Sequence, residues 1–275
     1  MRTSPCSVLA RYPGRVTMSS SVERPSSGQA RKRVAVVTGG AAGIGQAYAV
    51  RLAQDGHEVA IADLEPATET LDLISSLGHA GWARYCDVSD PDSVSAFSGL
   101  ALERFGPADI LVANAGIYPT TPFEQLLWQE WRRVMSVNLD SLFRLTKAFL
   151  PGMVERKWGR IIAQSSVVVR TGPENFVHYT ASKAGVTGFV HSLAAEVARH
   201  GVTANCIAPS LVRSKGTIEG PHESLGWFED LVEAQAIKRT QLPIDLVGAL
   251  SFLASDDSAF MTGQTLFVDG GLVRS

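Results

Sequence analysis

One stretch of the chain constrains its fold more than any other. Val34–Thr38 is a short apolar run rich in β-branched residues, and Gly39, Gly43 and Gly45 follow it before a helical pattern over residues 46–54. Gly39 permits a tight turn, Gly43 lets the main chain approach a pyrophosphate, and Gly45 allows close helix packing. The spacing differs from the commoner G-x-G-x-x-G, but the order still predicts a strand, a dinucleotide-binding turn and a helix.

Beyond this stretch, strand-like runs alternate with helical patterns, which indicates βαβ units and a parallel sheet. We expect strands at residues 34–38, 59–62, 82–86, 110–113, 160–164, 203–207 and 266–268. We expect helices at residues 45–54, 67–77, 91–105, 129–157, 176–199 and 243–254. The predicted fold class is α/β, a single doubly wound Rossmann domain over residues 32–275 with a seven-stranded, mostly parallel sheet and helices on both faces.

Residues 1–31 differ from the rest, because they hold five arginines, three prolines and many serines but a single acid, Glu23. Such a segment cannot bury enough apolar surface to offset its ordering entropy, so we expect a disordered extension. A basic, serine-rich start is also typical of an organelle transit peptide. The alternative is a misassigned start with Met18 as the working initiator, which the poor helical periodicity favours.

The charge balance excludes some partner classes. The chain carries 25 basic and 27 acidic residues, so nothing favours nucleic acid or an anionic membrane as a partner. Its three cysteines lie far apart without a C-x-x-C pair, which favours reduced thiols in the cytoplasm and argues against a metal site. No apolar run reaches the length of a membrane span.

A second motif carries the candidate chemistry. Tyr179 and Lys183 are four residues apart in a segment of helix formers, so they share a helix face. A nearby ammonium favours the phenolate, and we therefore expect Lys183 to lower the pKa of Tyr179 toward the neutral range. The adjacent His178 does not share that face, and we interpret it as pocket wall or surface. A lone Y-x-x-x-K also occurs by chance, so the motif is weak by itself.

Taken together, the two motifs resemble the short-chain dehydrogenase/reductase family. Its members combine Thr-Gly-x-x-x-Gly-x-Gly with Tyr-x-x-x-Lys and a serine thirteen residues before the tyrosine, where Ser166 stands. The resemblance implies that Tyr179 is the acid or base, that Lys183 tunes it, and that Ser166 orients the substrate oxygen. It also implies that Asn138 holds a water in a proton relay. Ser165 is the competing serine, one residue off register.

The cofactor is expected to be NAD(H). Asp63 closes the second strand eighteen residues after Gly45, where a Rossmann acid binds the adenosine ribose and repels a 2′-phosphate. Ala42 and Leu64 add no positive charge; the alternative is that Asp63 only caps the next helix. The resemblance implies further cofactor contacts from Gly39, Gly43, Ile44, Gly45, Asp87, Val88, Asn114, Tyr179, Lys183, Val212 and Ser214.

The substrate is least constrained. Residues 215–241 form a long segment interpreted as a substrate lid that begins at about residue 210, and the pocket walls are expected from Tyr118, Val168, Phe176, Trp227 and Phe228. A small apolar secondary alcohol or ketone suits such walls, and several stretches resemble the NAD-dependent (S)-1-phenylethanol dehydrogenase branch. Pyridoxal 4-dehydrogenase-like and 3-oxoacyl-carrier reductase-like activities, or a non-catalytic dinucleotide-binding regulator, remain alternatives. The family usually assembles as homotetramers.

Overall fold

The computed structural model describes residues 32–218 and 226–274, and the expected N-terminal extension lies outside them. Its centre is a seven-stranded sheet in the order β3-β2-β1-β4-β5-β6-β7. All neighbouring strands pair in parallel, so the sheet is more regular than the mostly parallel one that we expected. The strands are β1 (Val34–Thr38), β2 (Glu58–Asp63), β3 (Gly81–Tyr85), β4 (Ile110–Ala113), β5 (Gly159–Gln164), β6 (Val202–Pro209) and β7 (Thr265–Val268).

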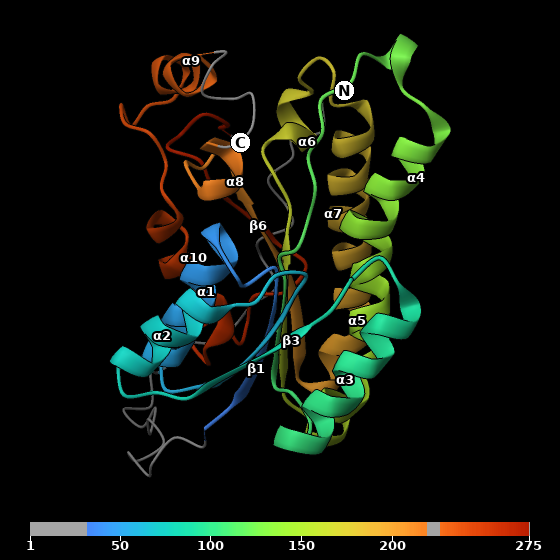
Figure 1. The fold of residues 1–275 in the computed structure, drawn as a ribbon, viewed down its shortest axis with the longest axis vertical. Helices are drawn as coiled ribbons and strands as arrows, with labels where there is room; N and C mark the ends of the chain where they lie inside the picture. The colour runs from blue at the N-terminus through green and yellow to red at the C-terminus, as the bar shows by residue number, and fades with distance from the viewer. Residues whose placement is uncertain (1–31, 219–225, 275) are drawn as a thin grey trace, which may run out of the picture. The chain divides into compact units, whose positions relative to one another are not determined.

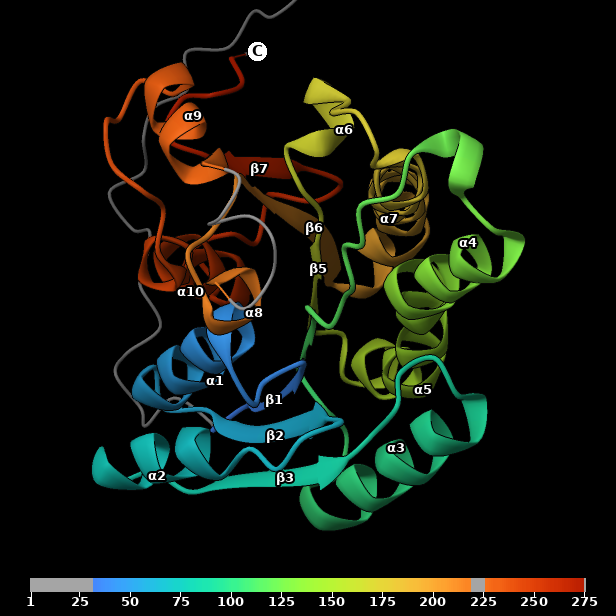
Figure 2. The same ribbon diagram turned by 45° about the horizontal axis from the view of Figure 1, so that its top comes forward.

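Helices cover both faces of the sheet, as Figures 1 and 2 show. On one face lie α1 (Gly43–Gln54), α2 (Thr68–Ser76) and α10 (Val247–Ala254), and on the other α3 (Pro91–Phe105), α5 (Ser141–Arg156) and α7 (Val177–Val197). Alternate residues of β1 serve the two cores: Val34 and Val36 pack on the α5 side, whereas Ala35 and Val37 pack on the α1 side. Because both faces of the sheet are buried, the strands consist of nearly continuous runs of apolar residues.

The strand order reverses beside β1, whose neighbours are β2 and β4. The connections leave the carboxyl ends of the adjacent strands β1 and β4 toward opposite faces of the sheet, which opens a crevice where open α/β sheets bind their ligands. The glycine turn after β1 lies at this position. No helix within the described residues is long and apolar enough to cross a lipid bilayer.

The expected helix over residues 129–157 is wrong as a single element. The structure divides it into α4 (Trp128–Met135), a π-helical turn (Ser136–Asp140) and α5. A π turn accommodates one extra residue and re-aims the side chains that it carries, and such turns are frequent at functional sites. Here the turn carries Asn138, whose side chain is buried.

The segment interpreted as a lid is partly helical. It contains α8 (Lys215–Ile218) and α9 (Trp227–Ala234), and residues 219–225 between them lie outside the described part of the chain. The segment returns to the sheet through Gln241, which forms an isolated bridge with Val212. Both ends of the lid are therefore anchored near the carboxyl end of β6.

Candidate active site

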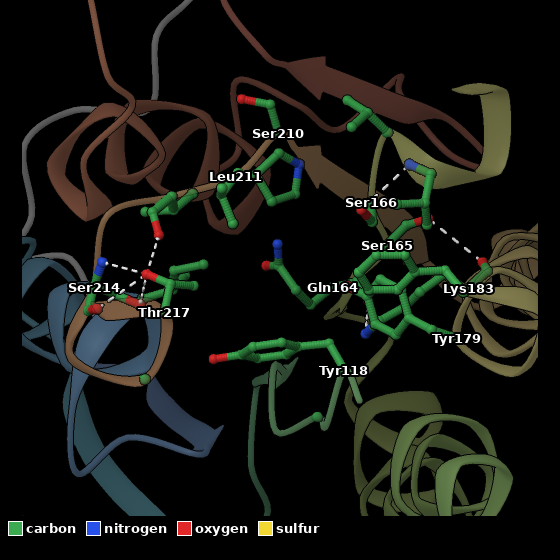
Figure 3. Close-up of a pocket in the computed structure, with 18 of the residues that line it drawn as sticks. Tyr118, Gln164, Ser165, Ser166, Tyr179, Lys183, Ser210, Leu211, Ser214 and Thr217 are labelled. Carbon is green, nitrogen blue, oxygen red and sulfur yellow. Dashed lines mark hydrogen bonds between the residues drawn. The ribbon is translucent and has the colours of Figure 1, made fainter. Parts of the chain in front are cut away.

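A cavity of about 730 Å³ opens at the carboxyl ends of the strands. Its walls come from the glycine turn, the segments that follow β4, β5 and β6, the start of α7, and the lid (Figure 3). Fourteen of the residues expected at the site line it: Gly39, Gly43, Ile44, Gly45, Asn114, Tyr118, Ser166, Val168, Phe176, Tyr179, Lys183, Val212, Ser214 and Trp227. The parallel sheet thus brings together motifs that lie far apart in sequence.

The glycine turn has the shape of an anion cradle. Gly39 and Gly43 adopt positive φ angles of 68° and 60°, which favour glycine. No side chain caps the first turn of α1, whose N-cap is Ala42, so main-chain N-H groups at this helix N-terminus remain for a ligand. A Cβ atom at Gly43 would lie 3.3 Å from the Cβ of Ser214, so the glycine turn and the loop after β6 approach each other closely here.

Asn114 has a structural role in this turn. Its Nδ2 donates to the carbonyl oxygens of Thr38 and Gly39, at 3.0 and 3.3 Å, and its backbone N donates to the Thr38 hydroxyl. These bonds tie the end of β4 to the turn after β1. Asn114 also lines the cavity, so it both holds the cradle and faces the site.

Ser166 and Tyr179 lie together at the cavity, as the motif spacing predicts. The Ser166 hydroxyl is close enough to the Tyr179 phenol to favour its ionised form, although Ser166 follows β5 and Tyr179 lies in the first turn of α7. Both residues line the cavity. The competing Ser165 faces the other way, because its hydroxyl contacts Thr187 at 3.1 Å inside the protein.

The expected lowering of the Tyr179 pKa is wrong for the protein alone. Burial raises the pKa of Tyr179 to about 12, and this outweighs the opposing effect of the Ser166 hydrogen bond. Burial also lowers the pKa of Lys183 to about 8. The Lys183 ammonium group is directed to the Gln164 carbonyl oxygen at 2.7 Å, and it lies 5.8 Å from the Tyr179 ring centre. The spacing in the sequence predicted that Tyr179 and Lys183 share a helix face, but it did not predict their hydrogen-bond partners.

Asn138 lies behind these residues. Its Oδ1 accepts from the Ile117 backbone N at 2.8 Å, and its Nδ2 donates to the Ile117 carbonyl oxygen and the Ser182 hydroxyl. Both amide hydrogens are therefore engaged, and one lone pair of Oδ1 remains for a relay water. A Cβ atom at Gly116 would lie 3.2 Å from this Oδ1 and 3.5 Å from the Lys183 Nζ, so Asn138 and Lys183 both approach the backbone at Gly116.

The expected adenosine-binding residues lie outside the main cavity. Both carboxylate oxygens of Asp63 accept hydrogen bonds, from the Ala41 N at 2.8 Å and the Glu65 N at 3.0 Å. Asp87 Oδ1 accepts from the Ser89 N and hydroxyl, and Val88 is buried. Asp63 therefore does not cap α2, whose N-cap is Ala67 without a side-chain hydrogen bond, and each oxygen of Asp63 keeps a second lone pair.

The loop after β6 contains contacts that the sequence did not reveal. Both the backbone N and the hydroxyl of Ser210 donate to the Gln241 Oε1, at 3.0 and 2.9 Å. The Thr217 hydroxyl donates to the Val212 carbonyl oxygen at 2.7 Å and accepts from the Ser214 N. Gln241 and Thr217 thus hold this loop against the cavity, and no motif identifies either residue.

Aromatic rings form the far wall of the cavity. The Tyr179 ring contacts Tyr118 edge to face with centroids 6.3 Å apart, and it contacts Phe176, which in turn meets Trp227 of α9. Tyr118, Val168, Phe176 and Trp227 line the cavity as expected. Phe228 does not, because its side chain is buried against the Arg213 guanidinium. The helical period points neighbouring residues of α9 to different sides.

The interpretation of His178 as pocket wall or surface is also wrong. Its side chain is fully buried, and its Nε2 lies 3.2 Å from the Glu130 Oε1, which accepts a second hydrogen bond from the Thr121 hydroxyl. Glu130 therefore links α4, the segment after β4 and the start of α7. This arrangement holds the first turn of α7, where Tyr179 lies.

The site has the shape and chemistry for a nicotinamide dinucleotide. An uncapped helix N-terminus and a glycine turn suit the pyrophosphate, and the cavity continues from there to the hydroxyl groups of Tyr179 and Ser166. Among the described residues, no group of three or more potential ligand side chains could hold a metal ion. The residues that would hold the dinucleotide are those of the glycine turn, the loop after β6, and Lys183.

Comparison with known proteins agrees with this geometry. Residues 39–273 match the family described as enoyl-(acyl carrier protein) reductase. The 3-oxoacyl-[acyl-carrier-protein] reductase of Vibrio cholerae is 37% identical over 87% of this chain and 97% of that protein. A subunit of (2S)-[(R)-hydroxy(phenyl)methyl]succinyl-CoA dehydrogenase from Thauera aromatica is 36% identical over 88% of this chain and 96% of its own length.

A solved structure extends the likeness to three dimensions. A proposed NAD(P)-dependent gluconate 5-dehydrogenase from Beutenbergia cavernae, with NADP bound, is 34% identical and superposes with a TM-score of 0.83. The alignment covers 88% of this chain and 97% of that one. The family match, the sequence identity and the shared fold thus agree with the site geometry, in which Ser166, Tyr179 and Lys183 line one cavity. The chain belongs to the short-chain dehydrogenase/reductase family of nicotinamide-dependent oxidoreductases.

Proposed function

We propose that the protein interconverts a small, neutral secondary alcohol and its ketone with NAD(H). The observation that carries this proposal is the position of the Ser166 and Tyr179 hydroxyl groups, which face a cavity whose outer wall is built from Phe176, Trp227 and other apolar side chains. Such a wall suits an alkyl or aryl group next to the reacting carbon. The likeness to the 1-phenylethanol dehydrogenase branch supports an aryl group.

Each reacting residue has a separate task in this proposal. The bound nicotinamide supplies or accepts the hydride. Ser166 donates a hydrogen bond to the substrate oxygen, and Tyr179 gives that oxygen a proton during ketone reduction. With a pKa of about 8, Lys183 is cationic at neutral pH, and it stabilises the phenolate that this proton transfer leaves behind. In alcohol oxidation the same groups act in reverse.

The choice of NAD(H) rests on Asp63. Its carboxylate follows β2, and the two lone pairs that remain free can accept hydrogen bonds from the adenosine ribose hydroxyls. The same negative charge would repel a 2′-phosphate, and neither Ala42 nor Leu64 offers a compensating cation. Against this, the solved relative from Beutenbergia cavernae carries NADP, so the cofactor requires a direct test.

The charges of the cavity support a neutral substrate. Among the described residues that line it, Lys183 is the one cation and is held beside the expected cofactor, whereas Glu174 and Asp230 are acidic. A carboxylate or phosphorylated substrate would meet these two acids without a basic partner at the substrate end. The runner-up is 3-oxoacyl-carrier reduction, which the Vibrio cholerae relative favours. Pyridoxal 4-dehydrogenase-like activity and a non-catalytic regulator are weaker alternatives, since all four catalytic positions are present.

A substrate panel tests cofactor and substrate together. We expect kcat/KM for aryl and alkyl secondary alcohols to exceed that for 3-hydroxyacyl thioesters and gluconate, and NAD to be preferred over NADP at least tenfold, as expected for about 1.4 kcal/mol. Initial rates measured with each cofactor separately give both ratios. A preference for the thioester with NADPH would establish the runner-up instead, and no turnover with any substrate would favour the regulator.

We also propose that the protein is a cytoplasmic homotetramer. Both cysteines in the described residues, Cys86 and Cys206, are buried free thiols, which is compatible with a reducing compartment. The large apolar side chains of Leu127, Trp128 and Phe143 are exposed on the α4 and α5 side of the chain, and a subunit interface would cover them.

Sedimentation velocity tests this assembly. The unmodified chain is expected to sediment as a tetramer, and Phe143→Glu is expected to shift it to smaller species, because a charge would enter the interface. Leu77→Glu, at the far end of α2, serves as the matched exposed control and is expected to leave the tetramer intact. A monomeric unmodified chain would disprove the assembly.

A further inference from the structure

Gln164 is the last residue of β5, and neither the expected site nor the steps above give its side chain a role. The residue is 8% exposed and lines the cavity. Its Oε1 accepts a hydrogen bond from the Tyr48 hydroxyl at 3.0 Å, whereas its Nε2 is buried without a hydrogen-bond partner in the described protein. A buried amide donor without an acceptor is unfavourable, so native proteins rarely retain one without a reason.

The orientation of this amide is fixed from behind. Tyr48 lies on the buried face of α1, and burial raises its pKa, so the phenol stays protonated and able to donate. With Oε1 held by Tyr48, Nε2 is the atom that remains for another acceptor. The main-chain oxygen of Gln164 is engaged as well, because it accepts from the Lys183 ammonium.

The position of the amide shows which ligand it could meet. In Figure 3 the Gln164 side chain lies at the middle of the cavity, with Tyr179 and Lys183 on one side and Ser214 and Thr217 on the other. Tyr179 and Lys183 lie at the end of the cavity where we expect the reaction, and Ser214 and Thr217 lie at the end that borders the glycine turn. A dinucleotide that spans these two sides must pass Gln164 with its nicotinamide half.

We propose that the Gln164 Nε2 donates a hydrogen bond to an oxygen of the nicotinamide half of the bound dinucleotide. The acceptor belongs to the carboxamide, the ribose or the adjacent phosphate, all of which present oxygen lone pairs. A neutral donor can bind any of them without placing another charge beside Lys183. The proposal rests on dinucleotide binding in this cavity, and it is independent of the alcohol substrate and of the choice between NAD and NADP.

Binding measurements on two variants test this contact. Gln164→Met keeps the length and volume of the side chain but removes the donor, and Gln164→Glu keeps the acceptor for Tyr48 but replaces the donor with an anionic oxygen. Titration by protein fluorescence, with whichever of NADH or NADPH binds the unmodified chain, is expected to give a Kd about tenfold higher for Gln164→Met, and a larger increase for Gln164→Glu. Neither variant is expected to change the Kd for AMP, which lacks the nicotinamide half.

ADP-ribose then identifies the oxygen. If Gln164→Met also raises the Kd for ADP-ribose about tenfold, the contact is to the ribose or the phosphate. If it raises the Kd for the complete dinucleotide alone, the contact is to the carboxamide. Tyr48→Phe is expected to raise the dinucleotide Kd less than Gln164→Met does, because the Gln164 amide remains but is no longer held in one orientation. An unchanged dinucleotide Kd in Gln164→Met would overturn the proposal. An equal increase in the Kd for AMP would also overturn the proposal, because such an increase would indicate a general distortion of the cleft.

Discussion

Tyr179→Phe is expected to lower kcat for ketone reduction by about 1000-fold, within the range that a lost general acid or base gives. The substitution removes only the hydroxyl, which lies near the Ser166 hydroxyl at the cavity wall. The phenylalanine ring still fills the space beside Tyr118 and Phe176, so the dinucleotide Kd is expected to stay within about threefold, a difference of well under 1 kcal/mol. Steady-state kinetics and fluorescence titration of the same preparation separate the two effects.

The control for this prediction is another phenol in the same wall. Tyr118→Phe removes a hydroxyl from the ring that meets Tyr179 edge to face, and it is expected to change kcat less than tenfold. The pH profile gives a second check. Lys183 loses its proton above about pH 8, so the rate of reduction by the unmodified chain is expected to decline above that pH. The residual rate of Tyr179→Phe is expected to show no such decline. Turnover of Tyr179→Phe at the unmodified rate would remove Tyr179 from the mechanism.

The sequence predicted the strands well because a parallel strand buried on both faces needs an uninterrupted apolar run. The bounds of β1 and β4 agree with the expected ones at both ends, and the other five strands differ by one or two residues at one or both ends. The convergence of Ser166, Tyr179 and Lys183 at the cavity was also predictable, since Tyr179 and Lys183 occupy one helix turn and Ser166 stands at a fixed spacing. These features depend on local order along the chain.

Features that depend on contacts between distant segments were not predictable. The π turn at Asn138 interrupts a continuous helical pattern, and its side-chain partners are Ile117 and Ser182, in other parts of the fold. The hydrogen bonds between Ser210 and Gln241 join residues 31 positions apart. The pKa of Tyr179 follows from burial, which no spacing encodes. Tertiary packing determines each of these, and the sequence pattern records only the residues that take part.

Gly45→Ala is expected to abolish measurable dinucleotide binding, an increase in Kd of at least 100-fold, or about 2.7 kcal/mol. A Cβ atom at this position would lie 1.9 Å from the Gly39 carbonyl oxygen and 2.7 Å from the Asn114 Nδ2. The first of these neighbours is main chain, so it cannot rotate away as a flexible side chain could. Either α1 moves back from the turn or the turn opens, and both changes disperse the N-H groups that would hold the pyrophosphate.

The matched control is Gly99→Ala, an exposed helical glycine in α3 whose added Cβ would meet nothing within 4 Å. This change is expected to leave the dinucleotide Kd unaltered and to stabilise the fold by about 0.5–1 kcal/mol, since alanine is the better helix former. Circular dichroism establishes whether Gly45→Ala is folded, and calorimetric titration with NADH and NADPH measures its affinity. A folded Gly45→Ala protein that binds either dinucleotide within threefold of the unmodified chain would show that the pyrophosphate does not rest on this turn, because no intact cradle can accommodate a contact of 1.9 Å.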